Sequence, residues 1–165
     1  MNTLTTRPLR EEHRGLAAGA ETLREAAEAV EHTGWKTMTL LDESVDFLLY
    51  RLIPYLRAAS AVLYPRIEEA LNAPGATAAV NRDLEEILSL TREVVTLRDG
   101  LTAAPTRQER RSLQRALYGL HAIVRLHLAK EAEIYLPRLA SALAEEESAR
   151  LLAELTEEAN RLAEH

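Results

Sequence analysis

Apolar residues recur at alternating steps of three and four along four long segments of this chain, a spacing that places them on one face of an α-helix. No segment shows the alternation of apolar and polar residues that is typical of a half-buried β-strand. Leu, Ala, Glu and Arg, which favour helices, dominate the composition. We therefore expect an all-α fold. The four stripes are Leu9, His13, Leu16, Ala20, Leu23, Ala27 and Val30; Leu41, Val45, Leu48, Leu52, Tyr55, Ala59 and Val62; Val80, Leu84, Ile87, Thr91 and Val94; and Leu113, Leu117, Leu120, Val124, His127, Glu131 and Ile134.

Two loop signals separate the chain into halves. Residues 72–75 read Asn-Ala-Pro-Gly, and residues 99–105 begin with Asp-Gly and end with Pro, combinations that interrupt helices. Long helices with short links pack as an up-down-up-down four-helix bundle, which we expect over about residues 8–143. A further amphipathic segment, about residues 145–163, predicts an additional C-terminal helix that lies across the others. Residues 1–165 are thus expected to form a single domain.

The composition excludes several classes of function. The 165 residues include no cysteine, which rules out disulfides, Cys-ligated metal sites and thiol nucleophiles and favours a cytoplasmic location. No apolar run approaches the roughly 18 residues that span a bilayer, so we expect no membrane association. The formal net charge is -6 and the Lys and Arg residues are scattered along the chain, so we expect no nucleic-acid binding.

Histidine and glutamate interrupt two of the apolar stripes. His13 lies on the first stripe, and His127 and Glu131, four residues apart, lie among the leucines of the fourth. Burying such groups costs free energy unless something pairs them. A pair at i and i+4 presents both side chains to the same point, and His13 on a neighbouring helix can complete a binding face.

The second and fourth segments look like duplicates of one another. Laying residues 55–66 over residues 127–138 aligns a Pro-Arg pair at the same offset. On this register Tyr55 and Ala59 stand where the fourth segment has its histidine and glutamate. The first and third segments align likewise, and Leu84 stands opposite the histidine of the first. Each half therefore keeps polar residues that the other half lacks.

Three motifs of this chain resemble those of the hemerythrin-like (HHE cation-binding) domains. They are Glu12-His13-Arg14, His127-x-x-x-Glu131 and Ile134-Tyr135-Leu136-Pro137, and the likeness covers about residues 8–160. The resemblance implies a four-helix bundle that holds a non-haem di-iron centre. It also implies oxygen binding, or a role in handling or sensing iron, oxygen or peroxide.

The resemblance implies metal-ligand roles for His13, His127 and Glu131. The family's ligand positions on helices two and three are occupied by uncharged residues, namely Tyr55, Ala59 and Leu84. Without the helix-two carboxylate, one bridge between the irons and its charge are lost, so we expect at most one iron or other divalent ion. Two imidazoles and one carboxylate suit a single non-haem Fe(II), and zinc also accepts them. The Tyr55 phenolate is a further candidate ligand for ferric iron.

Other potential ligands lie off the predicted stripes. His121 is six residues before His127, which places it some 120° around the helix and makes it a poor replacement ligand. Asp83 and Glu86 are candidate substitutes on the third helix, and the helical angle of Asp83 points it away from the core.

An alternative interpretation needs no metal. His127 and Glu131 can hydrogen-bond one another, with His13 and the Tyr55 hydroxyl completing a buried polar network. The chain would then be a metal-free helical bundle that binds another protein or a second copy of itself. We assign no catalytic residue, and the sequence leaves open whether the chain is an enzyme.

Overall fold

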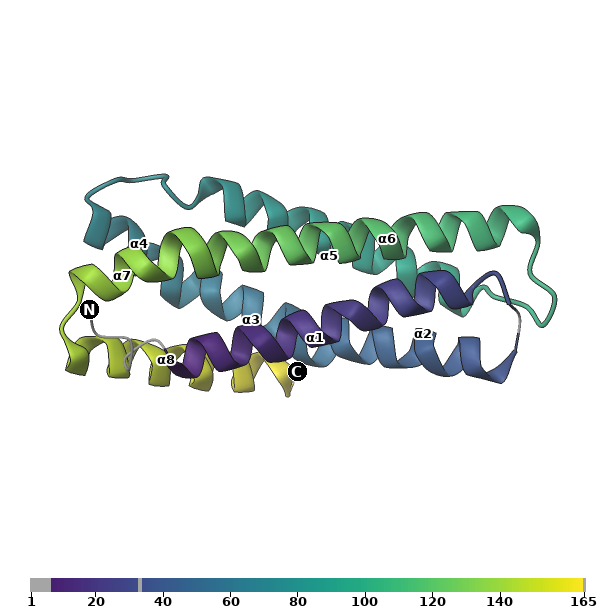
Figure 1. The fold of residues 1–165 in the computed structure, drawn as a ribbon, viewed down its shortest axis with the longest axis horizontal. Helices are drawn as coiled ribbons and strands as arrows, with labels where there is room; N and C mark the ends of the chain where they lie inside the picture. Colours follow the sequence, from purple (N-terminus) through teal and green to yellow (C-terminus); the bar gives the residue numbers. More distant parts are fainter. Residues whose placement is uncertain (1–6, 33, 165) are drawn as a thin grey trace.

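The computed structural model describes residues 7–32 and 34–164, and within these residues all regular secondary structure is helical, with no β-strand. Four long helices lie side by side in an up-down-up-down bundle, which confirms the predicted fold (Figure 1). The first and third are α1 (Arg7–Ala29) and α5 (Ala78–Asp99). The second runs through α2 (Trp35–Phe47), η1 (Leu48–Leu52), α3 (Ile53–Ala58), η2 (Ala59–Leu63) and α4 (Tyr64–Leu71). The fourth runs through α6 (Arg107–Lys130), η3 (Glu131–Tyr135) and α7 (Leu136–Ala142).

The predicted C-terminal helix is α8 (Glu145–Ala163). It packs along α3 and the adjoining turns η1 and η2, and buries Leu151 and Leu155 against them. Figure 1 shows α8 running back along the bundle from the end of α7, and not across the other helices as expected from the sequence. None of the helices from Arg7 to Ala163 combines the length and the apolar character needed to cross a membrane.

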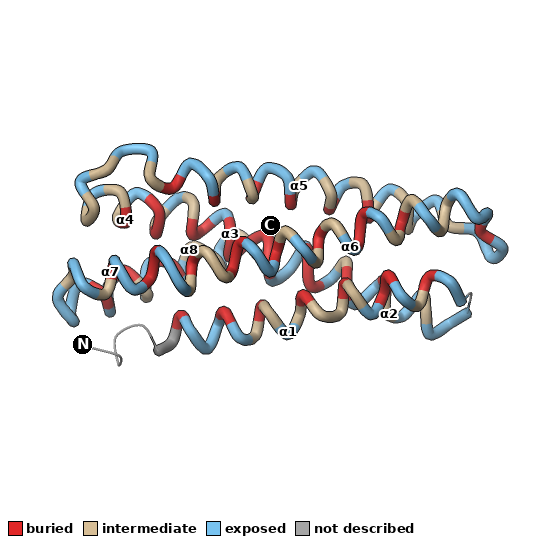
Figure 2. The backbone as a smooth tube through the Cα atoms, turned by 45° about the horizontal axis from the view of Figure 1, so that its top comes forward, coloured by how far each residue is buried: buried red, intermediate tan, exposed pale blue. Residues whose placement is uncertain are grey.

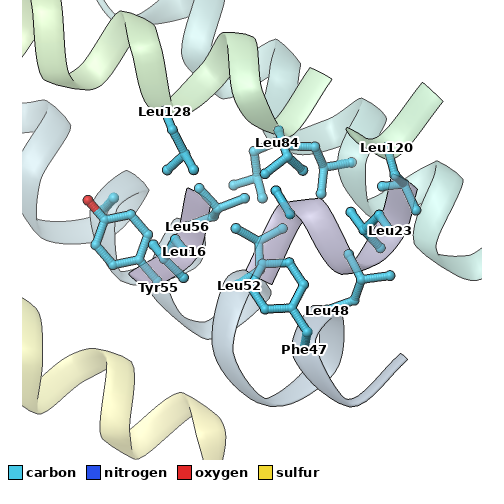
Figure 3. Packing of buried hydrophobic residues seen from close by; sticks show 14 of the residues in the cluster. Leu16, Leu23, Phe47, Leu48, Leu52, Tyr55, Leu56, Leu84, Leu120 and Leu128 are labelled. Atoms are coloured by element: carbon cyan, nitrogen blue, oxygen red, sulfur yellow. The ribbon is translucent and has the colours of Figure 1, made fainter. Parts of the chain in front are cut away.

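The core lies between the four long helices, where the buried positions of each helix face inward (Figure 2). Every residue of the first and third predicted stripes is buried. Leucines from the first, second and fourth helices interdigitate at the centre, among them Leu16, Leu52 and Leu120 (Figure 3). Burial of such side chains stabilises the fold by about 1.5–3 kcal/mol each.

The second and fourth stripes differ from the prediction at their ends. Val45 and Val62 are only partly buried and Ile134 is 44% exposed, although all three were expected in the core. Leu63 and Tyr135, one residue further along, are buried instead. The inward face of both helices is therefore shifted by one residue at the same place in the repeat.

The π-helical turns η2 and η3 cause this shift, and like η1 each ends two residues before a proline. A proline has no N–H and its ring clashes with the carbonyl four residues earlier, so a regular helix cannot continue through it. The residue before Pro65 donates its backbone N–H to the Ala59 carbonyl, and the residue before Pro137 donates to Glu131, both five residues back. Each turn thus accommodates one extra residue. The recurrence of η2 and η3 at equivalent positions agrees with the duplication seen in the sequence.

The aromatic ring of Phe47 packs against α1 at Gly19. A Cβ atom on Gly19 would lie 2.1 Å from a ring carbon of Phe47, whereas a Cβ atom on Gly119 would lie 3.5 Å from Leu90, an ordinary contact. Both glycines lie within helices, so replacement by alanine gives each helix the same gain of about 1 kcal/mol. Overpacking costs about 1–3 kcal/mol.

We therefore expect Gly19→Ala to be less stable than Gly119→Ala by about 1–3 kcal/mol. The measurement is the free energy of unfolding from urea denaturation of both variants and the unchanged protein. Gly119→Ala should exceed the unchanged protein in stability. Equal stability of the two variants would show that Phe47 does not occupy the space above Gly19.

Candidate metal centre

Five polar side chains from three of the four long helices meet within the core of the bundle. His13 comes from α1, Tyr55 from α3, Tyr64 from the first turn of α4, His127 from the end of α6, and Glu131 from the start of η3. All five are buried, and His127 and Glu131 have no exposed surface. The structure therefore brings together the four residues expected from the sequence and adds Tyr64. We call these five residues the Glu131 cluster.

On one side of the Glu131 cluster, three atoms lie at the corners of a triangle. The Nε2 atom of His13 lies 2.7 Å from the Tyr55 Oη atom and 2.8 Å from Glu131 Oε2. The Tyr55 hydroxyl donates a hydrogen bond of 2.9 Å to the same carboxylate oxygen. An imidazole nitrogen, a phenol oxygen and a carboxylate oxygen are thus in mutual contact.

A second triangle lies on the other side of the carboxylate. The Nε2 atom of His127 lies 3.0 Å from the Tyr64 Oη atom and 3.3 Å from Glu131 Oε1. The Tyr64 hydroxyl also donates a hydrogen bond to this oxygen. Each oxygen of Glu131 therefore contacts one histidine and one tyrosine, and the carboxylate joins the two triangles.

Both imidazoles point their Nε2 atoms into the Glu131 cluster and their Nδ1 atoms away from it. The Nδ1 atom of His127 faces a carboxylate oxygen of Asp83 at 3.5 Å, and Lys130 Nζ holds that carboxylate at 2.8 and 3.0 Å. The Nδ1 atoms of both histidines are buried, and neither makes a hydrogen bond with the described residues, so Asp83 faces His127 at ion-pair distance only. A carboxylate behind an imidazole is the usual support of a metal-ligating histidine, because it fixes the orientation of the ring.

The charge of the Glu131 cluster is concentrated on its carboxylate. Burial acts to raise the pKa of Glu131, but hydrogen bonds from His127 and His13 outweigh it and hold the pKa well below its ordinary value. Burial, followed by the charge of Glu131, raises the pKa of both Tyr55 and Tyr64. Without a cation, the cluster therefore consists of one carboxylate anion and two neutral phenols that donate hydrogen bonds to it.

Comparison with protein-family models matches residues 5–139 to the family described as the hemerythrin HHE cation binding domain. This chain belongs to that family. Comparisons with curated proteins and with solved structures give no significant match. The matched region ends before α8, so this hemerythrin-family chain carries α8 outside the part that the family model covers.

Two ligand positions expected of a hemerythrin-family domain are apolar in the folded chain. Ala59 and Leu84 are both buried in the hydrophobic core. His121 does not replace them, because its Nε2 atom lies 3.1 Å from Glu21 on the flank between α6 and α1. Glu86 is exposed on α5. Of the residues considered from the sequence, these four supply nothing to the Glu131 cluster.

Tyr64 was not identified from the sequence as a site residue. It follows Tyr55 by nine residues, which in a regular α-helix places the two side chains on opposite faces. The π turn η2 absorbs one residue between them and turns Tyr64 inward. The signal that could have revealed it is Pro65, because a proline inside a long helix marks a place where regular spacing fails.

The chemistry and spacing of the Glu131 cluster fit a metal cation. Imidazole, carboxylate and phenolate are all ligands that iron accepts. Ligands at right angles around an ion, each about 2.1 Å from it, lie about 3 Å apart. The three contacts of the Tyr55 triangle measure 2.7 to 2.9 Å. In the other triangle His127 Nε2 lies 3.0 and 3.3 Å from its two partners, and the contact of Tyr64 with Glu131 is closer. Within the described residues, no three His, Cys, Asp or Glu side chains are grouped so that they could hold an ion. Tyr55 and Tyr64 are therefore candidate ligands in addition to His13, His127 and Glu131.

A cavity of about 360 Å³ borders the Glu131 cluster on the Tyr55 side. It lies between α1, the second helix and α8, and its lining includes Glu12, Arg51, Leu155 and Thr156. This cavity gives a small molecule a place beside Tyr55.

Proposed function

We propose that this chain is an iron-binding hemerythrin-family protein with an altered ligand set, and that it serves in handling or sensing oxygen, peroxide or iron. The observation that carries this proposal is the convergence of two imidazole Nε2 atoms and two phenols on the single carboxylate of Glu131. A buried polar cluster of this composition contains ligands for iron but no arrangement typical of hydrolytic catalysis.

The residues of the Glu131 cluster and their neighbours have distinct roles in this proposal. His13, His127 and Glu131 would hold the cation, with Tyr55 and Tyr64 beside them. Bound iron supplies one-electron redox chemistry and open positions for oxygen or peroxide. The Asp83 carboxylate, 3.5 Å from His127 Nδ1, would orient that ring. The cluster is buried, which strengthens electrostatic interactions within it.

Iron retention tests this proposal. Protein purified without a chelator or a polyhistidine tag is loaded anaerobically with ferrous iron, passed through a desalting column and analysed for metal. We expect iron to remain with the unchanged protein and with Glu133→Gln, which changes an exposed residue of the same turn, and to be lost from Glu131→Gln. A protein that retains no metal would contradict the proposal and would favour the metal-free bundle.

A further inference from the structure

We propose that Tyr55 and Tyr64 are themselves ligands, each paired with one histidine, so that Glu131 bridges two half-sites. The Tyr55 half-site consists of His13 Nε2, Tyr55 Oη and Glu131 Oε2, and the Tyr64 half-site consists of His127 Nε2, Tyr64 Oη and Glu131 Oε1. This inference rests on the proposed function, because it specifies how the Glu131 cluster holds its cations.

The two triangles have the same composition and different carboxylate oxygens. In the Tyr55 half-site the three contacts are 2.7, 2.8 and 2.9 Å, so its donors form one nearly equilateral face. That spacing equals one face of an octahedral coordination shell, which leaves the opposite positions open. A carboxylate that presents one oxygen to each of two such faces is placed to bridge two ions.

As ligands, the tyrosines would also replace the negative charge lost with the helix-two carboxylate. Counting only imidazoles and carboxylates gives the cluster one negative charge, from Glu131, which is too little for two cations. Each phenol gives up its proton to solvent when it ligates, and two phenolates raise the negative charge of the cluster to three. The tyrosines thus offset the charge of the carboxylate that is absent at Ala59.

The local structure of the helices positions both tyrosines. Tyr55 lies in α3 between the π turns η1 and η2, Tyr64 is the first residue after η2, and Glu131 opens the equivalent turn η3. Turns of this kind occur frequently at functional sites, where they re-aim side chains. The turn η2 allows one helix to direct two tyrosines nine residues apart to the same carboxylate.

Stoichiometry and spectroscopy of iron-loaded protein test the inference. Ferric phenolate complexes absorb visible light through charge transfer from the phenolate to iron, and resonance Raman scattering excited in that band shows tyrosinate ring vibrations. The unchanged protein, loaded anaerobically and then exposed to air, should bind about two irons per chain and show this band. The Raman measurement needs no variant, so it tests the inference even if a substitution impairs folding.

The matched variants are Tyr55→Phe, Tyr64→Phe and the double variant, with Tyr50→Phe as the control because Tyr50 is 61% exposed on the same long helix. Each single variant should lose roughly half of the band and about one iron, and the double variant should lose the band. Iron that binds without tyrosinate vibrations, or saturates at one ion per chain, would overturn this inference and leave the proposed function standing. Complete absence of bound iron would overturn both.

Discussion

Replacing Glu131 with alanine should lower the free energy of unfolding of the iron-free protein by about 3–5 kcal/mol, the cost of removing one partner from a buried charged network. Both carboxylate oxygens accept hydrogen bonds inside the core, from Tyr55 and Tyr64. The substitution leaves these phenols and the two imidazoles without their shared partner and opens a cavity. Urea denaturation at neutral pH measures the loss.

The control for this prediction is Glu133→Ala. Glu133 lies in the same π turn as Glu131 but is exposed, so its replacement should change stability by no more than about 0.5 kcal/mol. If Glu131→Ala and Glu133→Ala unfold at the same urea concentration, the carboxylate is not the centre of a buried network.

Replacing Asp83 with asparagine should weaken iron binding about 10- to 100-fold, the usual effect of removing the carboxylate behind a ligating histidine. Asp83 lies 3.5 Å from His127 Nδ1 and is held in place by Lys130. The amide keeps the size of the side chain but removes the charge that orients the ring. Competition with a chelator of known affinity measures the change.

Glu86→Gln is the matched control for Asp83→Asn, because Glu86 is an exposed carboxylate on the same helix. It should leave the iron affinity unchanged. Urea denaturation of both iron-free variants separates positioning from general stability, because a positioning role predicts a loss of affinity larger than any loss of stability. Equal iron affinity of the two variants would remove Asp83 from the site.

The sequence predicts the helices of this fold well because their apolar stripes follow regular helical spacing. Every stripe residue of α1 and α5, from Leu9 to Val30 and from Val80 to Val94, is buried as predicted. The prediction of buried positions is wrong at Val62 and Ile134 because regular helical spacing assumes a constant number of residues per turn. The π turns before Pro65 and Pro137 each add one residue.

The residues of the candidate site likewise differ in whether regular helical spacing predicts them. His13, His127 and Glu131 were recognised because polar residues on an apolar stripe need partners, and the structure places them in contact. Tyr64 depends on the π turn η2, so regular spacing hides it. The contact of Asp83 with His127 depends on how α5 packs against α6, and the helical angle of a single helix does not contain that information.

Diffraction from crystals soaked anaerobically in ferrous iron, recorded at the iron absorption edge, tests most directly whether the Glu131 cluster is a metal centre. We expect anomalous density within bonding distance of the Glu131 oxygens, on the sides that face His13 and His127. A cluster without anomalous density, in which both tyrosines still donate hydrogen bonds to Glu131, would contradict this and would show a polar network that is complete without metal.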